Sequence, residues 1–143
     1  MLRACAGAIG LFATTASALD FRSIADAPSI LYGGPSLKTE KLYVVSAASP
    51  VEVISAIEGW VKVRTVGGEI AWAESASLVP RRMVAIVVPV AVIRASPADT
   101  AQSSASARKG VALEFVESSG AWVRVRHRDG IQGYVRATEV WGL

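Results

Sequence analysis

An internal repeat at an offset of 62 residues is the feature that most constrains this chain. Shifted by that offset, the sequence aligns identical residues without a gap: Trp60 with Trp122, Val63 with Val125 and Gly68 with Gly130. The register holds from Phe21 to Val79. Self-similarity at a fixed period indicates a duplicated structural unit, so we expect two copies of one small module.

Each copy has the sequence pattern of short β-strands. In 50–54 the residues alternate between apolar and polar, with Val51 and Val53 on one face and Glu52 on the other, and 112–116 repeats the pattern. Helical periodicity is nearly absent after residue 18. Short strands at close spacing favour an all-β chain made of two small barrels.

The tryptophan segments predict one β-hairpin in each copy. Gly67-Gly68 and Asp129-Gly130 are signals of a two-residue turn. Counting from these turns predicts Val63 opposite Trp72 and Val125 opposite Tyr134. It also predicts Ala71 opposite Arg64 and Gly133 opposite Arg126. Trp60, Lys62 and Arg64 are then expected on the face away from the valines.

The first eighteen residues have the pattern of a cleavable signal peptide. Arg3 gives a positive start, 4–13 is apolar, and Ala16-Ser17-Ala18 matches a cleavage site. Cys5 is the only cysteine and would leave with this segment, so we expect no disulfide in the mature protein. The predicted location is the bacterial periplasm, without stable membrane insertion after cleavage.

The remaining sequence divides into 19–79 and 83–143, joined by the short linker Pro80-Arg81-Arg82. The first part is acidic, with five Lys/Arg and seven Asp/Glu from 19 to 79. The second is basic, with nine Lys/Arg and five Asp/Glu from 80 to 143. The basic copy could therefore face the acidic copy or an anionic polymer.

Together these motifs resemble the bacterial SH3-like (SH3b) domain family. The matches in the first copy are Gly34-Pro35, Pro50-Val51-Glu52-Val53-Ile54, Trp60-Val61-Lys62-Val63, Gly68, Ala71-Trp72-Ala73 and Leu78. Those in the second are Ser96-Pro97, Lys109-Gly110-Val111, Trp122-Val123-Arg124-Val125, Asp129-Gly130, Gly133-Tyr134-Val135 and Val140. The sequence departs from the family pattern where Ala48 and Ala71 occupy glycine positions and Tyr134 replaces tryptophan.

The sequence lacks the parts of common enzyme sites. No cysteine follows Cys5, and His127 is the only histidine, so neither a Cys/His pair nor a histidine-rich metal site can be assembled. No Gly-x-Ser-x-Gly motif and no glycine-rich phosphate loop is present. We therefore expect no catalysis, cofactor or metal; a minimal enzyme using Glu58, Glu69 and Glu74 is a remote alternative.

Binding residues are easier to nominate. Trp60 with Arg64, and Trp122 with Arg126, can form strips in which a ring covers an apolar surface and a guanidinium pairs with a carboxylate. Tyr32 and Arg94, just before the proline turns, are further candidates. The opposing interpretation places both tryptophans in the barrel cores.

The SH3b resemblance implies a module that binds peptidoglycan or a protein of the cell envelope. The alternative is a structural or regulatory interaction module without affinity for peptidoglycan. Nucleic acid is a poor candidate partner, because the protein is predicted to lie outside the cytoplasm and the net charge of the whole chain is only +3.

Overall fold

The computed structural model describes residues 18–143. The predicted signal peptide and Cys5 therefore lie outside the described residues, Ala18 excepted. Over 18–143 the chain forms β-strands and two single-turn 3-10 helices, η1 (Ser75–Ser77) and η2 (Ala137–Glu139). In this part of the chain there is no helix of the length and apolarity needed to cross a membrane. The all-β prediction is confirmed.

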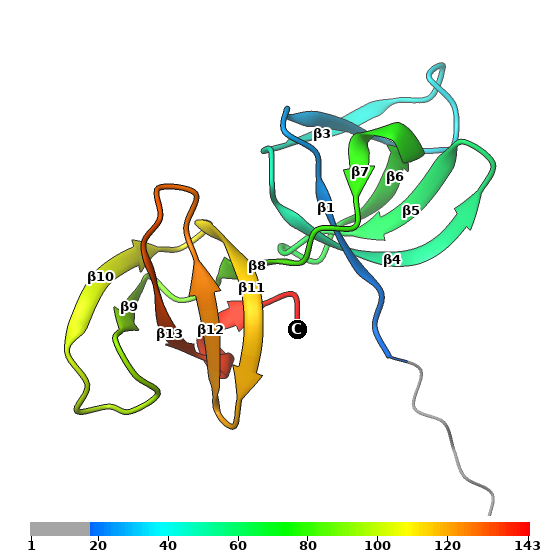
Figure 1. Cartoon of the computed structure of the whole chain (residues 1–143). Coiled ribbons are helices and arrows are strands. Elements are labelled where there is room, and N and C mark those ends of the chain that lie inside the picture. Colours follow the sequence, from blue (N-terminus) through cyan, green and yellow to red (C-terminus); the bar gives the residue numbers. More distant parts are fainter. Residues whose placement is uncertain (1–17) are drawn as a thin grey trace, which may run out of the picture.

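The first copy folds into a seven-stranded antiparallel sheet in the order β3-β2-β6-β5-β4-β1-β7. Its strands are β1 (Phe21–Ile24), β2 (Ser29–Tyr32), β3 (Lys41–Val45), β4 (Pro50–Ile57), β5 (Trp60–Arg64), β6 (Ile70–Glu74) and β7 (Leu78–Val79). The sheet curls on itself into a small barrel (Figure 1).

The second copy repeats this topology in the order β10-β9-β13-β12-β11-β8-β14. Its strands are β8 (Met83–Ile86), β9 (Val90–Arg94), β10 (Ser103–Arg108), β11 (Ala112–Ser119), β12 (Trp122–Arg126), β13 (Gln132–Arg136) and β14 (Val140–Trp141). A β-bulge recurs at the same place, between Val53 and Ser55 in one copy and Phe115 and Glu117 in the other. The duplication in sequence is therefore a duplication in structure.

Each barrel has its own core, built from the inward residues of alternating strands. In β5, Val61 and Val63 are buried while the residues between and beside them are half-buried. In β12, Val123 and Val125 are buried in the same way, and Arg126 at the end of the strand is exposed. β-Branched side chains suit such positions because they pack well on a pleated surface. The remaining central members are Ile24, Leu31, Val51, Ala71 and Ala73 in the first copy, and Val84, Ile86, Ala91, Ile93, Ala107, Leu113, Val135 and Val140 in the second.

The predicted hairpin register is wrong by one residue. Val63 pairs with Ala71 and Val125 with Gly133, so Trp72 lies opposite Lys62 and not opposite valine. The reason is the loop, which has three residues: Thr65 and Glu69 still pair across it, and Gly68 adopts φ +92°. A turn closed by a left-handed glycine is a common three-residue hairpin connection.

The same correction applies to the second hairpin, where Gly130 adopts φ +91° and His127 pairs with Ile131. Tyr134 consequently lies opposite Arg124. The one-residue shift moves Trp72 and Tyr134 to the outer face of each sheet, together with Trp60 and Trp122. Aromatic and basic side chains thus gather on one surface of each barrel.

The edge strands of the two copies differ in character. The stretch 103–107, predicted as a loop or a thin edge strand, forms the edge strand β10 and carries small polar residues. Its counterpart β3 is also an edge strand, but it exposes Leu42, Tyr43 and Val44. An exposed apolar edge is unusual because it can pair with another chain.

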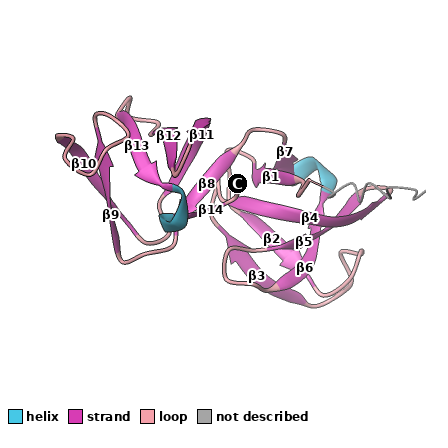
Figure 2. Ribbon diagram, turned by 90° about the horizontal axis from the view of Figure 1, so that it is seen from below, coloured by secondary structure: helices cyan, strands magenta, loops and turns pink. Residues whose placement is uncertain are grey.

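The two barrels meet through aromatic residues near the junction, and the C-terminus lies between them (Figures 1 and 2). The ring centroids of Phe21 and Trp141 are 5.1 Å apart in an edge-on arrangement. The linker residue Arg82 has its guanidinium 6.0 Å from the ring of Phe21 and 5.0 Å from that of Phe115. Arg82 also donates a hydrogen bond to the carbonyl of Gly142 at 3.0 Å. A cation thus links an aromatic residue of each barrel.

The two copies differ at these contact positions. The equivalents at the 62-residue offset are Met83 for Phe21, Val79 for Trp141, Val53 for Phe115 and Asp20 for Arg82. Each of these four residues is an aromatic or a cation, and its equivalent in the other copy is an acid or an apolar residue without a ring.

Candidate ligand-binding surfaces

Trp60 and Trp122 lie on the outer faces of their sheets, half-buried and outside the core clusters of residues 18–143. Strand alternation explains this, because each tryptophan precedes a valine that points inward. The interpretation that they fill the barrel cores is therefore wrong. Each ring is partly available at the surface, although neighbouring side chains cover part of it.

In the first copy the neighbour of Trp60 is Tyr32. Their ring centroids are 5.4 Å apart at an interplanar angle of 89°, and Tyr32 is only 6% exposed. On the same face the ammonium of Lys62 lies 5.9 Å from the ring of Trp72. Glu74 is the cross-strand partner of Trp60. This surface is mainly aromatic, and it carries charge of both signs.

In the second copy Trp122 lines a small groove that also contains Arg94, a residue nominated separately from the sequence. The groove has a volume of about 90 Å³ and is lined by Val90, Val92, Arg94, Asp99, Trp122, Arg136 and Glu139; we call it the Trp122 groove. The guanidinium of Arg136 lies 4.8 Å from the Trp122 ring and pairs with Asp99. Arg94 donates to the carbonyl of Ala101 at 2.9 Å.

The two outer faces are therefore not chemically equivalent. Arg94 corresponds to Tyr32, Arg136 to Glu74 and Asp99 to Leu37 at the 62-residue offset. The first copy packs an aromatic residue against its tryptophan, and the second packs an arginine. Only the second places two arginines in a groove with the indole. Arg136 shares its guanidinium with Asp99, and Arg94 uses one donor on the carbonyl of Ala101, so a ligand that combines an apolar face with an acid would bind the remaining donors.

The other two nominated residues, Arg64 and Arg126, do not join these tryptophans. Arg64 pairs with Glu52 at 2.7 Å, and Arg126 makes two hydrogen bonds to Glu114, at 2.9 and 3.2 Å. The hydrogen bond and the charge of Glu114 raise the pKa of the Arg126 guanidinium. These cross-strand ion pairs use donors that the predicted aromatic strips would have offered to a ligand.

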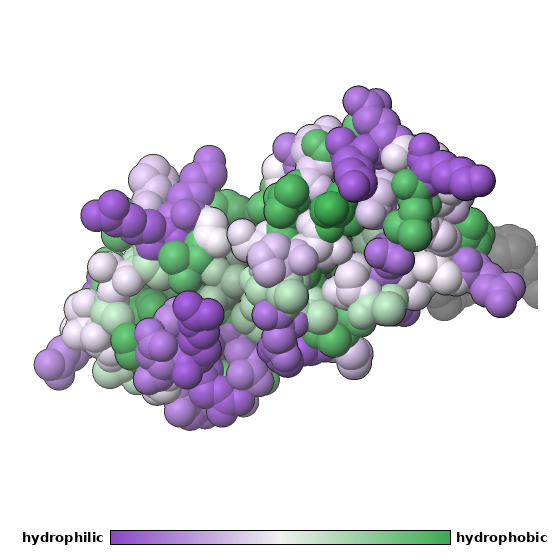
Figure 3. All heavy atoms as spheres, turned by 90° about the horizontal axis from the view of Figure 1, so that it is seen from above, coloured by the Kyte–Doolittle hydropathy of each residue, from purple (hydrophilic) through white to green (hydrophobic). Residues whose placement is uncertain are grey.

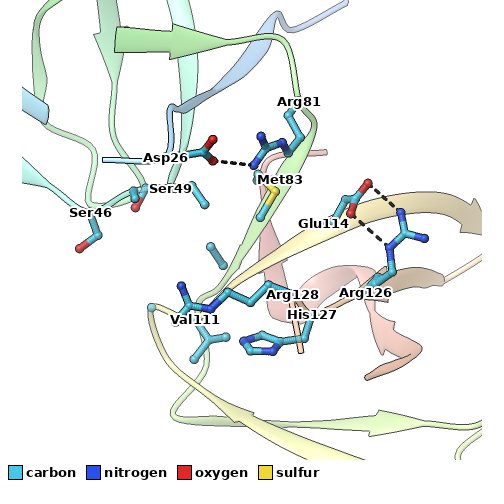
Figure 4. A pocket seen from close by; sticks show the side chains of 14 residues that line it. Asp26, Ser46, Ser49, Arg81, Met83, Val111, Glu114, Arg126, His127 and Arg128 are labelled. Carbon is cyan, nitrogen blue, oxygen red and sulfur yellow. Dashed lines mark hydrogen bonds and ion pairs between the residues drawn. The ribbon is translucent and has the colours of Figure 1, made fainter. Parts of the chain in front are cut away.

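Arg126 instead lines a larger cavity between the barrels, which we call the central cavity (Figure 4). Its volume is about 570 Å³, and both barrels and the linker contribute to its walls. Among its lining residues, Arg81, His127 and Arg128 were not nominated from the sequence. The sequence does contain the run Arg126-His127-Arg128 beside a hairpin turn. Such a run is expected to be exposed to solvent unless the orientation of the two barrels is known.

The described residues contain no group of three or more His, Cys, Asp or Glu side chains placed to hold a metal ion. Glu69 has a lowered pKa, caused mainly by the hydrogen bond from the Thr65 hydroxyl and then by a backbone hydrogen bond. That carboxylate closes the first hairpin loop. Its perturbation therefore has a local structural cause.

Three solved structures resemble the chain at low identity. NlpC2 from Trichomonas vaginalis is 15% identical with a TM-score of 0.39, covering 89% of this chain and 49% of that chain. NlpC1 from the same organism is 15% identical with a TM-score of 0.37, covering 90% and 47%. An NlpC/P60 family protein from Bacillus cereus is 14% identical with a TM-score of 0.40, covering 85% and 55%. The chain spans about half the length of these structures.

No curated protein matches the chain. Two family models, each described as a bacterial SH3 domain, match consecutive parts of it, at residues 29–79 and 87–142. Each match covers the hairpin and the tryptophan of one barrel. The chain therefore belongs to the bacterial SH3 domain family and carries two of these domains in tandem.

Proposed function

We propose that this protein is an exported, non-enzymatic module that binds peptidoglycan in the periplasm, with the Trp122 groove of the second domain as the principal contact. The observation that carries the proposal is the placement of Arg94 and Arg136 beside the half-buried ring of Trp122. Export rests on the signal-peptide pattern of residues 1–18.

The chemistry of the groove suits a glycan that carries acidic peptides. An indole covers the apolar face of a sugar ring, and a guanidinium donates paired hydrogen bonds to a carboxylate. A volume of about 90 Å³ is small, so the groove takes one chemical group and not a whole disaccharide peptide. We therefore expect weak binding per site, strengthened where a polymer offers many repeats.

The non-enzymatic part of the proposal rests on the composition of the chain. After Cys5 there is no thiol, and the single imidazole, His127, accepts a hydrogen bond from the backbone amide of Asp129. A nucleophile and base pair of the cysteine–histidine type cannot be formed from these residues.

Sedimentation with purified sacculi tests the proposal. We expect the protein to pellet with sacculi, and Trp122→Ala and Arg94→Ala to shift it to the supernatant while circular dichroism shows the fold retained. Trp60→Ala is the matched control, since it removes the same ring from the domain without the two arginines, and we expect a smaller loss. Wild-type protein that stays in the supernatant would sink the proposal.

A second candidate function, binding of an envelope protein without affinity for peptidoglycan, is favoured by the edge strand β3. Val44 is 76% exposed, and Leu42 and Tyr43 are exposed beside it. An unpaired apolar strand can receive a strand of a partner protein. If sacculi leave the protein in solution while Val44→Lys abolishes its crosslinking to another envelope protein, this second function replaces the first.

A further inference from the structure

We propose that the central cavity is a second binding site, for a small ligand that carries a carboxylate or a phosphate, and that Arg128 is its principal anchor. The site is distinct from the Trp122 groove and shares no lining residue with it. It exists only because the two domains are docked, since each contributes a wall.

Small side chains keep the cavity open. The turn before β4 contributes Ser46, Ala47, Ala48 and Ser49, and the facing segment of the second domain contributes Gly110 and Ala112. The volume of about 570 Å³ lies within the range of about 300–1,000 Å³ that is usual for small-molecule sites. Backbone groups and two hydroxyls are thus within the walls for a polar ligand to contact.

The charges in the cavity leave one arginine without a partner. Arg81 pairs with Asp26 at 3.2 Å and Arg126 pairs with Glu114, but Arg128 makes no ion pair or side-chain hydrogen bond with any of residues 18–143. In Figure 4 the side chains of Arg128 and His127 lie across the cavity from Asp26 and Ser46. An incoming oxyanion would therefore meet a guanidinium whose donors are all available.

The basic tip is specific to the second domain. At the 62-residue offset His127 and Arg128 correspond to Thr65 and Val66, and Ile131 corresponds to Glu69. In the first domain the Thr65 hydroxyl donates to Glu69, which closes that hairpin on itself. The second hairpin has no acid at that position. Its own acid, Asp129, lies 3.2 Å from His127, and the neighbouring Arg128 has no ion pair within residues 18–143.

The junction holds the cavity in a preformed state. Arg82 lies between Phe21 and Phe115, and Phe21 contacts Trp141, so the contact between the domains involves both strands and linker. Figure 3 shows hydrophobic and pale residues continuing across this junction on one face. A ligand that enters a preformed site avoids the cost of ordering its walls.

A guanidinium binds carboxylate and phosphate alike through paired donors, so the test uses one probe of each kind. The ¹⁵N-labelled full chain is titrated at low ionic strength with inorganic phosphate and, separately, with N-acetylalanine. We expect saturable shifts of the backbone amides of Ala47, Gly110 and Arg128 with at least one probe, and the probe that binds identifies the anion.

Two variants separate a site from general attraction. Arg128→Glu should weaken binding at least about tenfold, while Lys38→Glu, which reverses one exposed charge on the first domain, should leave it unchanged. Arg128 is exposed at a hairpin tip, so its replacement is expected to leave the spectrum of the core unaltered. The proposal is overturned if neither probe shifts these amides, if Arg128→Glu binds as the wild type does, or if both variants lose binding equally.

Discussion

Replacing Gly133 with alanine is expected to destabilise the second domain and to disturb the Trp122 groove. A Cβ at this position would lie 2.5 Å from the carbonyl oxygen of Arg94 and 2.6 Å from Cγ2 of Ile93. Because one of these atoms belongs to the backbone, β9 must move by about 0.9 Å before an ordinary contact is restored. Arg94, at the end of β9, moves with it.

The size of the effect follows from two opposing terms. Overpacking of this kind costs about 1–3 kcal/mol, and removing a glycine from the unfolded chain returns about 0.4–1 kcal/mol. The difference is a net loss of about 0–2.6 kcal/mol, and its midpoint of about 1.3 kcal/mol lowers the melting temperature of a domain of this size by about 5–10 °C. The first domain tolerates Ala71 at the equivalent position, where Leu31 replaces Ile93 and lacks a branch at Cβ.

Differential scanning calorimetry and amide hydrogen exchange measure the effect globally and in β9. The control is Gln132→Ala, at an exposed position of the same strand, which should leave both unchanged. The double variant Gly133→Ala with Ile93→Leu should recover part of the loss, since it removes one of the two short contacts. A Gly133→Ala protein with wild-type melting temperature and unchanged exchange in β9 would refute the steric reasoning.

Three further outcomes are expected. Ala48 has φ 62°, where the other copy has Gly110. Ala48→Gly should therefore raise the free energy of unfolding by about 0.5 kcal/mol, measured as a higher urea midpoint. A lower midpoint would contradict the backbone strain assigned to Ala48. Arg82→Ala should weaken the docking of the two domains by about 1–2 kcal/mol and give the domains different rotational correlation times in ¹⁵N relaxation. A common correlation time in the variant would contradict the role of Arg82 between Phe21 and Phe115. Thr65→Val should raise the pKa of Glu69 in an NMR titration. Because that pKa is lowered in the fold, its stabilising effect is present above the ordinary carboxyl pKa and disappears as pH falls; an unmoved pKa refutes the assigned cause.

The repeat, the strands and the class of fold could be predicted because they depend on local patterns. Val61 and Val63 alternate with polar residues, and the same alternation recurs 62 residues later. The hairpin register could not be fixed this way, since Gly68 serves a two-residue turn and the observed three-residue loop about equally well. One residue in the loop decides which face Trp72 occupies.

The candidate surfaces were predicted in part. Trp122 and Arg94 do share a groove, whereas Arg126 is engaged by Glu114. The importance of Arg128 was not predictable from the sequence. Periodic sequence patterns indicate strands and repeats, but they do not indicate how two similar barrels dock. The copies differ at Trp141 and Val79, but that difference is one of many along the repeat, and the contact of Trp141 with Phe21 is visible only in the structure.

The contact of Phe21 with Trp141 has a consequence for how the molecule is assembled. These residues belong to β1 and β14, the first and last strands in chain order, so the contact has a very large sequence separation. Each barrel closes through contacts within its own 62-residue repeat, which form sooner than distant ones. We therefore expect docking to be the last step of folding, which makes the central cavity the last part of the molecule to acquire its shape.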